Sequence, residues 1–408
     1  MMSELAKTLK THFTSVKNPV HEVKLKPLES ETNFSSKIYL ADISFSNSED
    51  IKNLFAKTNP SFKNSKEINI FNNHFFNEAF FYNEAFPELI AELNCKNMIE
   101  NLISQCHLAN INSIIVDNEA IKGFKIGPKF LNIAHLRIAM KGLALYHASS
   151  LIFKFRQPDK FKELVSKIKE TFSPNLKREE FPWRLTTIDA LDRFIKSYPE
   201  KAYNYQETIN HLKKLITDTA EFYKWLLRAD EPLSVLCHGD FNRNNMHFLY
   251  NENGEPIAVK FFDFQTIRYA SPTIDISFLY FMNVEPKIRA KNWETLISDY
   301  HGVLHSTICS ELLLNPGDMK LLNFDLSQFV CEYAKRAIYG MTITLHFFRT
   351  VFALDGEFEP SMWQPEPSKE YWTAYLKMGG DYCNQLSDQM ILHILEEGFA
   401  LHLVDFPN

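Results

Sequence analysis

The order of apolar and polar residues predicts strands early in the chain. Residues 37–45 alternate between apolar and polar side chains, which is the pattern of a half-buried strand. Residues 51–58 and 112–116 are also predicted to be strands. Between them, residues 69–92 carry phenylalanines at helical spacing, and Pro87 within this segment predicts a break or the start of a second helix.

Helical periodicity dominates from residue 135 onward. Residues 135–155 predict an amphipathic helix with one apolar face, and His147 on that face is interpreted as a hydrogen-bonded core residue. No internal repeat or flexible linker is evident. Further helices are predicted over residues 3–16, 161–172, 203–227, 273–282, 286–314, 319–354 and 369–397.

Residues 233–283 contain the densest group of candidate catalytic side chains. A short apolar run at residues 234–237 is typical of a buried strand, and it leads to His238 and Asp240 on a polar loop. Asn245 completes the spacing His-x-Asp-x4-Asn, which is that of a kinase catalytic loop.

A hairpin follows this loop. Residues 246–250 and 257–262 are predicted strands, and Asn253-Gly254 between them favours a tight turn. The hairpin returns Asp263 to the neighbourhood of Asn245. Asp263 begins the tripeptide Asp-Phe-Gln, at the place where protein kinases carry Asp-Phe-Gly.

These residue types match the chemistry of phosphoryl transfer. Asp240 can orient an acceptor hydroxyl and accept its proton, while Asn245 and Asp263 offer hard oxygen ligands to Mg²⁺. Asp275, in the first turn of the predicted helix at residues 273–282, can cap that helix and hold the loop. Each side chain taken alone also occurs as a turn cap. Their order, with a hairpin between them, favours a kinase-type site.

The same residues carry a resemblance to a known family. The chain resembles the ecdysteroid kinase-like small-molecule kinases of insects, which are related to choline and aminoglycoside kinases. The resemblance extends more weakly from about residue 33 to about residue 340. Its signature is His238-Gly239-Asp240-Phe241, Asn244-Asn245, Phe262-Asp263-Phe264-Gln265, and Ser271-Pro272 followed by Asp275.

The resemblance implies a fold and a division of the chain. The expected fold is α+β and two-lobed, like that of protein kinases, with a small β-rich N-terminal lobe and a large, mainly helical C-terminal lobe. Residues 1–27 are then an N-terminal extension and residues 28–116 the nucleotide-binding lobe. Residues 117–120 are the hinge, and residues 121–408 are the lobe with the catalytic loop and the acceptor-binding region.

The resemblance also implies roles for residues outside the catalytic loop. Lys57 matches the lysine that contacts nucleotide phosphates, although a solvent-facing lysine is the alternative. Glu78 is the expected ion-pair partner of Lys57, with Glu84 as the second choice. The phosphate loop contains no glycine, which departs from the family pattern. The remaining expected residues are Asn33, Ser35 and Ser36 over the ATP phosphates, Asp117 and Asn118 at the adenine, and His238 as structural support of the catalytic loop.

Composition narrows the class of protein further. The net charge of −6 gives no general attraction to nucleic acid or anionic membranes, and neither is expected as a partner. No signal peptide and no run of about eighteen apolar residues is present, so a cytoplasmic protein is expected. The six cysteines form no Cys-x-x-Cys pair, so neither a zinc site nor a disulfide framework is indicated.

The leading hypothesis is an ATP- and Mg²⁺-dependent phosphotransferase acting on a hydroxyl of a small, partly apolar molecule. The resemblance narrows this acceptor to an ecdysteroid or a related steroid or foreign alcohol, and the 35 phenylalanines suit an apolar pocket. One alternative is a catalytically weak pseudokinase that acts as a nucleotide or ligand sensor. Another is a choline-type kinase, whose cationic substrate could use the acidic segments 355–359 and 366–370.

Overall fold

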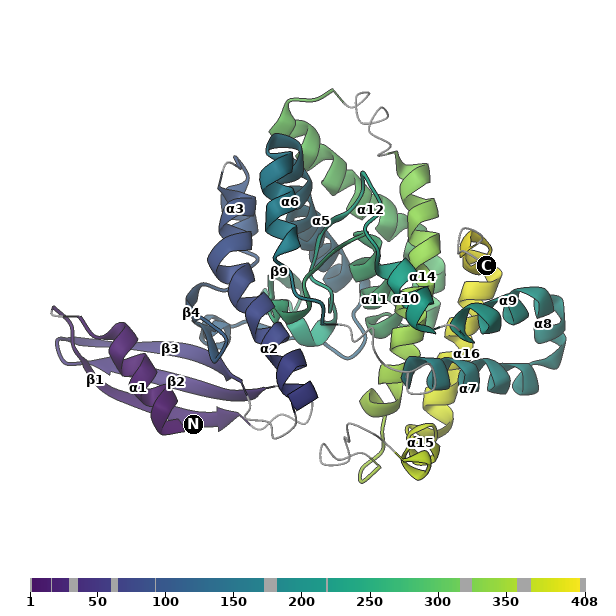
Figure 1. The fold of residues 1–408 in the computed structure, drawn as a ribbon, viewed down its shortest axis with the longest axis horizontal. Helices are drawn as coiled ribbons and strands as arrows, with labels where there is room; N and C mark the ends of the chain where they lie inside the picture. The colour runs from purple at the N-terminus through teal and green to yellow at the C-terminus, as the bar shows by residue number, and fades with distance from the viewer. Residues whose placement is uncertain are drawn as a thin grey trace.

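The structure is a computed structural model that describes residues 2–15, 17–28, 36–59, 65–91, 93–171, 182–217, 219–315, 325–357 and 368–403. An antiparallel sheet lies at one end of the molecule and a mainly helical body makes up the rest (Figure 1). The predicted two-lobed, protein-kinase-like α+β fold is confirmed. Among the described residues, no helix combines the length and the apolar character needed to cross a membrane.

The N-terminal sheet has the order β1-β2-β3-β5-β4, and every neighbouring pair is antiparallel. The sequence predicted no strand over residues 20–28, which form the edge strand β1. This strand is mostly exposed and carries several charged side chains, as edge strands often do, so its apolar pattern is weak. The strands are β1 (Val20–Leu28), β2 (Lys37–Phe45), β3 (Ser48–Thr58), β4 (Cys106–Ala109) and β5 (Ser113–Asp117).

Helices cover both faces of this sheet. Helix α1 (Met2–Phe13) packs Leu5 and Leu9 onto one face. The segment predicted over residues 69–92 lies on the other side as α2 (Ser65–Phe80), one π-helical turn (Phe81–Ala85) and α3 (Phe86–Ile90). Pro87 stands in the first turn of α3, where its missing N–H is tolerated.

The C-terminal lobe is organised around α5 (Ile133–Arg156). The expectation of a helix with a single apolar face is wrong, because every residue from 142 to 153 is buried. Small residues make this possible: a Cβ added at Gly142 would lie 2.9 Å from the side chains of Leu102 and Phe261. Helix α5 packs against α12 and strand β9.

The other predicted helices of this lobe have counterparts with shifted ends, and the segment predicted over residues 203–227 is divided among three helices. The helix predicted over residues 369–397 is two helices, because Gly379 and Gly380 have left-handed backbone conformations between them. Helix α7 had not been predicted. The helices are α4 (Lys96–Glu100), α6 (Pro158–Ser166), α7 (Pro182–Ser197), α8 (Pro199–Asn204), α9 (Gln206–Thr217), α10 (Thr219–Leu227), α11 (Thr273–Asn283), α12 (Pro286–Leu312), α14 (Leu326–Val351), α15 (Lys369–Tyr375) and α16 (Gly380–Glu396).

Short strands carry the loop that the sequence marks as catalytic. Strand β7 pairs with β10, and β8 pairs with β6 on one side and with β9 on the other. The predicted hairpin of β8 and β9 is confirmed, with Gly254 at its tip at a φ of 75°. The strands are β6 (Lys125–Ile126), β7 (Val235–Cys237), β8 (Met246–Tyr250), β9 (Pro256–Phe261) and β10 (Arg268–Ala270).

Candidate active site

Lys57 points away from α1 and into the space between the lobes. Strand alternation requires this, because Leu54 and Ala56 occupy the α1 side of β3. The ammonium Nζ donates to Oε2 of Glu78 at 2.7 Å and to Oδ1 of Asp263 at 2.7 Å. Burial alone would lower the pKa of Lys57, but the two carboxylates hold it above its usual range. Lys57 is therefore a buried cation held by two acids.

The structure brings Glu78, and not Glu84, to Lys57. The Glu78 side chain is 4% exposed and lies on the inner face of α2. Glu84 follows in the π-helical turn, faces solvent and pairs with Lys167 at 2.9 Å. Burial, opposed by Lys57, raises the pKa of Glu78 to about 7.

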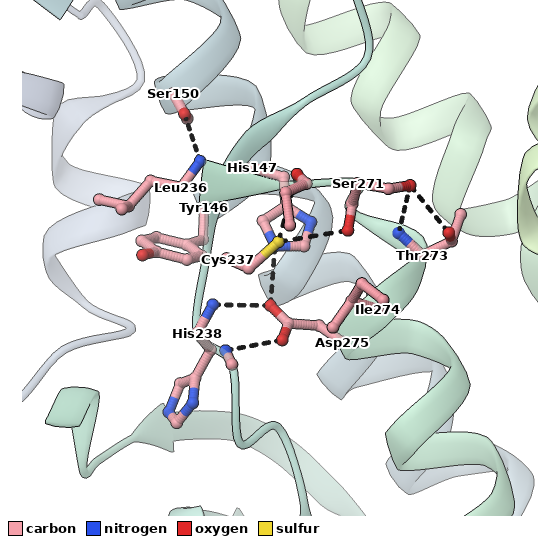
Figure 2. Close-up of polar contacts among 12 residues, drawn as sticks. Tyr146, His147, Ser150, Leu236, Cys237, His238, Ser271, Thr273, Ile274 and Asp275 are labelled. Atoms are coloured by element: carbon pink, nitrogen blue, oxygen red, sulfur yellow. Dashed lines mark hydrogen bonds and ion pairs between the residues drawn. The ribbon is translucent and has the colours of Figure 1, made fainter. Parts of the chain in front are cut away.

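Asp275 fixes the backbone of the loop that contains Asp240. Its carboxylate accepts hydrogen bonds from the backbone N–H of His238 at 2.7 Å and of Gly239 at 2.8 Å (Figure 2). Its Oδ2 also lies 3.1 Å from Nε2 of His147, a core histidine as expected. Burial acts in the opposite direction, but these contacts hold the pKa of Asp275 below its ordinary value. The first turn of α11 thus sets the position of the loop that contains Asp240.

Gly239 is the residue that lets the loop turn at this point. Its φ is 84°, in the left-handed region that favours glycine. A Cβ here would lie 2.0 Å from the backbone oxygen of Thr266. The loop therefore approaches η5 (Phe264–Thr266) so closely that a side chain at position 239 would not fit.

Two carboxamides hold the carboxylate of Asp240. Oδ1 accepts from Nδ2 of Asn242 at 2.8 Å, and Oδ2 accepts from Nδ2 of Asn245 at 2.8 Å. Burial and the negative charge of Asp263 raise the pKa of Asp240 to about 7. The carboxamide oxygen of Asn245 accepts no hydrogen bond from the described residues, so it remains available as a ligand.

Asp263 lies beside this group in a left-handed conformation, with φ 64° and ψ 63°. Gln265, two residues later, bridges the centre: its Oε1 accepts from Lys57 Nζ at 3.0 Å and its Nε2 donates to Oδ2 of Asp263 at 3.3 Å. The ring of Phe264 stacks on Phe81 with centroids 3.7 Å apart. This stacking ties the Asp-Phe-Gln segment to the helix that carries Glu78.

A cavity of about 540 Å³ joins these residues to an apolar region. Lys57, Glu78, Asp240, Asn245 and Asp263 line one part of it. Phe278 and Met282 from α11, with Phe347, Thr350 and Val351 from α14, line another. Ile38, Phe55, Ile114 and Val116 from the sheet also line it. The volume lies within the range of small-molecule sites.

The residues expected at the nucleotide lie in different situations. Ser36 lines the cavity, whereas Asn33 and Ser35 lie outside the described residues. Asp117 lines the cavity but bonds to His107 at 2.7 Å. Asn118 also lines it, and its Oδ1 accepts from the backbone N–H of Ala120. The side chains at positions 117 and 118 are therefore already engaged with neighbouring groups of the protein.

Sequence reasoning missed two sets of lining residues. Gln265 was noted only as part of the signature, although its position beside Asp263 could have suggested a contact. The residues of α14 gave no signal, because they lie more than eighty positions after Asp263 and share the periodicity of any core helix.

His147, Cys237 and Asp275 form one group of potential metal ligands within the described part of the chain (Figure 2). Both oxygens of Asp275 already accept backbone hydrogen bonds. Nδ1 of His147 lies 2.7 Å from the hydroxyl of Tyr300. The group is completely buried and is a hydrogen-bonded core.

Comparison with known proteins gives both structural and family matches. Choline kinase from Cryptosporidium parvum Iowa II is 12% identical, with 98% of each chain covered and a TM-score of 0.44. Ethanolamine kinase from Plasmodium vivax is 14% identical, with 87% of this chain and 81% of that chain covered and a TM-score of 0.38. No curated protein sequence matches the chain.

The family comparison is more decisive. The model of the ecdysteroid kinase-like family matches residues 30–311, a range that includes Lys57, Glu78, Asp240 and Asp263. This range is more than half of the chain. The chain therefore belongs to the ecdysteroid kinase-like family and is a small-molecule kinase that acts on an alcohol.

Proposed function

We propose that the protein transfers a phosphoryl group from ATP to a hydroxyl of a small, largely apolar alcohol, of which an ecdysteroid or a related steroid or foreign alcohol is an example. One observation carries this proposal. The same cavity is lined by the Asp240, Asn245 and Asp263 group and by the apolar side chains of α11 and α14.

The oxygen donors fit a hard cation. Asn245 has a free carboxamide oxygen, and Asp263 presents a carboxylate whose present partners are Lys57 and Gln265. These two residues would hold Mg²⁺, and the bound ion would neutralise charge on the phosphates of ATP. Lys57, buried and positively charged, would contact the same phosphates while Glu78 keeps it in place.

Asp240 is suited to orient the acceptor and take its proton. Its two oxygens are held by Asn242 and Asn245, so the carboxylate has little freedom to rotate. A pKa of about 7 is near the value at which a general base is most effective at neutral pH. Asp275 contributes by fixing the backbone on which Asp240 stands.

The far part of the cavity favours a neutral acceptor over a cationic one. Phe278, Met282, Phe347 and Val351 line it, and no described residue of the acidic segments at 355–357 or 368–370 does so. Glu357 instead accepts from the backbone N–H groups of Leu354 and Gly379, each at 2.8 Å. Among the described residues, neither segment therefore offers a carboxylate to a choline-type cation in the cavity.

An ATP-consumption screen of the purified protein against steroid, phenolic and choline-like alcohols tests the proposal. We expect turnover with steroid or phenolic alcohols and a loss of roughly 10²- to 10⁴-fold in Asp240→Asn, with ATP affinity changed by no more than a few-fold. Turnover with choline-like alcohols alone would refute the apolar acceptor. ATP binding without any turnover, equal in wild type and Asp240→Asn, would favour the sensor.

The metal assignment has a separate test. Asp263→Ala removes one hard ligand, so Mg²⁺ should no longer increase the stabilisation of the protein by ATP in a thermal-shift titration. An undiminished magnesium effect would contradict the role given to Asp263.

A further inference from the structure

Arg289, in the first turns of α12, is a buried cation without an acidic partner. Its residue is 1% exposed. Nη1 donates to the backbone oxygens of Tyr280 at 3.5 Å and Val284 at 3.3 Å, at the end of α11. Nε and Nη2 are buried and have no hydrogen-bond partner among the described residues. Two of the three guanidinium nitrogens are therefore unsatisfied.

Three residues near Arg289 also carry a buried polar atom without a hydrogen-bond partner: the hydroxyls of Tyr280 and Tyr333 and Nε2 of His393. The charge of Arg289 acts on Tyr333 and on His393. The rings of Tyr280 and Tyr333 have centroids 6.2 Å apart. Arg289 lies 4.7 Å above the ring of Phe281, which is 5.9 Å from His393. Helices α11, α12, α14 and α16 thus bring unpaired polar groups to one place.

The charge in this place is not balanced by the protein. Burial lowers the pKa of Arg289 to about 10, so it still carries its charge at neutral pH. Burial and the charge of Arg289 lower the pKa of His393 to about 3, so this histidine is neutral. Two carboxylates lie nearby. Glu397, which directly follows α16, is 31% exposed and 4.0 Å from His393 Nδ1. Asp299 adds to burial in raising the pKa of Tyr280, and it pairs with Arg137 at 3.5 Å. Within the described chain, no carboxylate forms an ion pair with Arg289.

We propose that a small monovalent anion, such as chloride, binds in the interior of the C-terminal lobe against Arg289, between Tyr280, Tyr333 and His393. Arg289 offers the N–H bonds of two nitrogens, Nε and Nη2, and the tyrosines offer two O–H groups, which are the donors that an anion requires. A buried charge is costly unless it is paired, and an anion supplies the missing charge where a water molecule does not.

Burial limits the size of this ligand. The four residues are at most 4% exposed, and none of them lines the cavity that contains Asp240. A monatomic anion suits so enclosed a place better than a phosphate or a carboxylate does. The site is therefore distinct from the proposed phosphoryl-transfer centre.

The position of this site gives it a structural consequence. Arg289 bonds to the C-terminal carbonyls of α11, and Asp275 in the first turn of the same helix holds the catalytic loop. An anion that neutralises Arg289 would lower the cost of keeping α12 against α11. Chloride should therefore stabilise the folded lobe and not act on the reacting groups directly.

Thermal unfolding of the full chain in sodium chloride and in sodium gluconate, at equal ionic strength, tests the proposal. Above the dissociation constant, the ratio of folded to unfolded protein should rise about tenfold for each tenfold rise in chloride. Arg289→Met should lose this dependence. The matched control Arg137→Met should keep it, since Arg137 is an exposed arginine paired with Asp299 at 3.5 Å.

If Arg289→Met does not fold, two further measurements test whether an anion binds at Arg289. Tyr333→Phe removes one donor and should shift the dependence to higher chloride concentration. Crystals soaked in bromide should show an anomalous peak against Arg289. Equal stability in chloride and gluconate, or a chloride effect that Arg289→Met retains, would overturn the proposal in favour of buried water. A bromide peak without a chloride effect on stability would mean an adventitious ion only and would also overturn it.

Discussion

The coupling between Lys57 and Glu78 gives a quantitative test of the centre. Lys57→Met leaves the buried Glu78 carboxylate without its cation, and removing one partner of such a pair costs about 3–5 kcal/mol of unfolding free energy. Glu78→Gln leaves Lys57 with Asp263 and Gln265, so its cost should be smaller, about 1–3 kcal/mol.

The double variant should lose less than the sum of the two single losses, by roughly 1–3 kcal/mol, because the two side chains act on each other directly. Urea unfolding measures these free energies, and steady-state kinetics should show the same non-additivity in kcat/KM. The control Glu84→Gln should change stability by no more than about 0.5 kcal/mol, since Glu84 pairs with Lys167 at the surface.

Additive losses would refute the reasoning, because they would mean that Lys57 does not depend on Glu78 for its position. A coupling of Lys57 to Glu84 of equal size would also refute it. In that case the face that α2 presents to the sheet would differ from the one described.

Three further changes have defined outcomes. In the pH profile at saturating ATP, kcat/KM for the acceptor should fall about tenfold per unit below pH 7 and level off above it, because Asp240 must be deprotonated to accept a proton. Because the pKa of Asp240 is raised on folding, its contribution to the free energy of unfolding is full below about pH 3.8 and is lost as the pH rises through 7. Urea unfolding at a series of pH values should show this loss in the wild type and not in Asp240→Asn. Gly239→Ala should abolish turnover and lower the thermal midpoint, since its Cβ would collide with the Thr266 carbonyl, and wild-type activity would contradict the described loop. Gln265→Leu should reduce kcat more than ATP affinity, because it removes both the acceptor for Lys57 and the donor to Asp263, and kinetics equal to those of the wild type would exclude a positioning role.

The local features of the centre were predictable because they depend on residues close together in the chain. His238, Asp240 and Asn245 stand within eight positions, and Asp263 follows after a hairpin whose turn is encoded by Asn253-Gly254. Turn chemistry and strand alternation fix such short connections before any distant contact forms.

Helix boundaries and helix faces were predicted less well. Helix α5 was expected to have one apolar face, but its small residues allow neighbours to approach from all sides. The helix predicted over residues 369–397 is interrupted at Gly379 and Gly380, whose left-handed conformations end one helix and begin the next. Periodicity alone distinguishes neither case, since an apolar position does not reveal which element packs on it.

The sequence by itself determined the two-lobed α+β class, the catalytic-loop spacing and the family to which the chain belongs. Only the tertiary structure decided which glutamate meets Lys57, that Gln265 joins Lys57 to Asp263, and that α11 and α14 give the cavity an apolar part. It also decided that Arg289 is buried without a carboxylate. The physical reason is the range of the interactions: spacing and turn residues act over a few positions, whereas charge pairing and burial join side chains up to some 200 positions apart, as for Lys57 and Asp263.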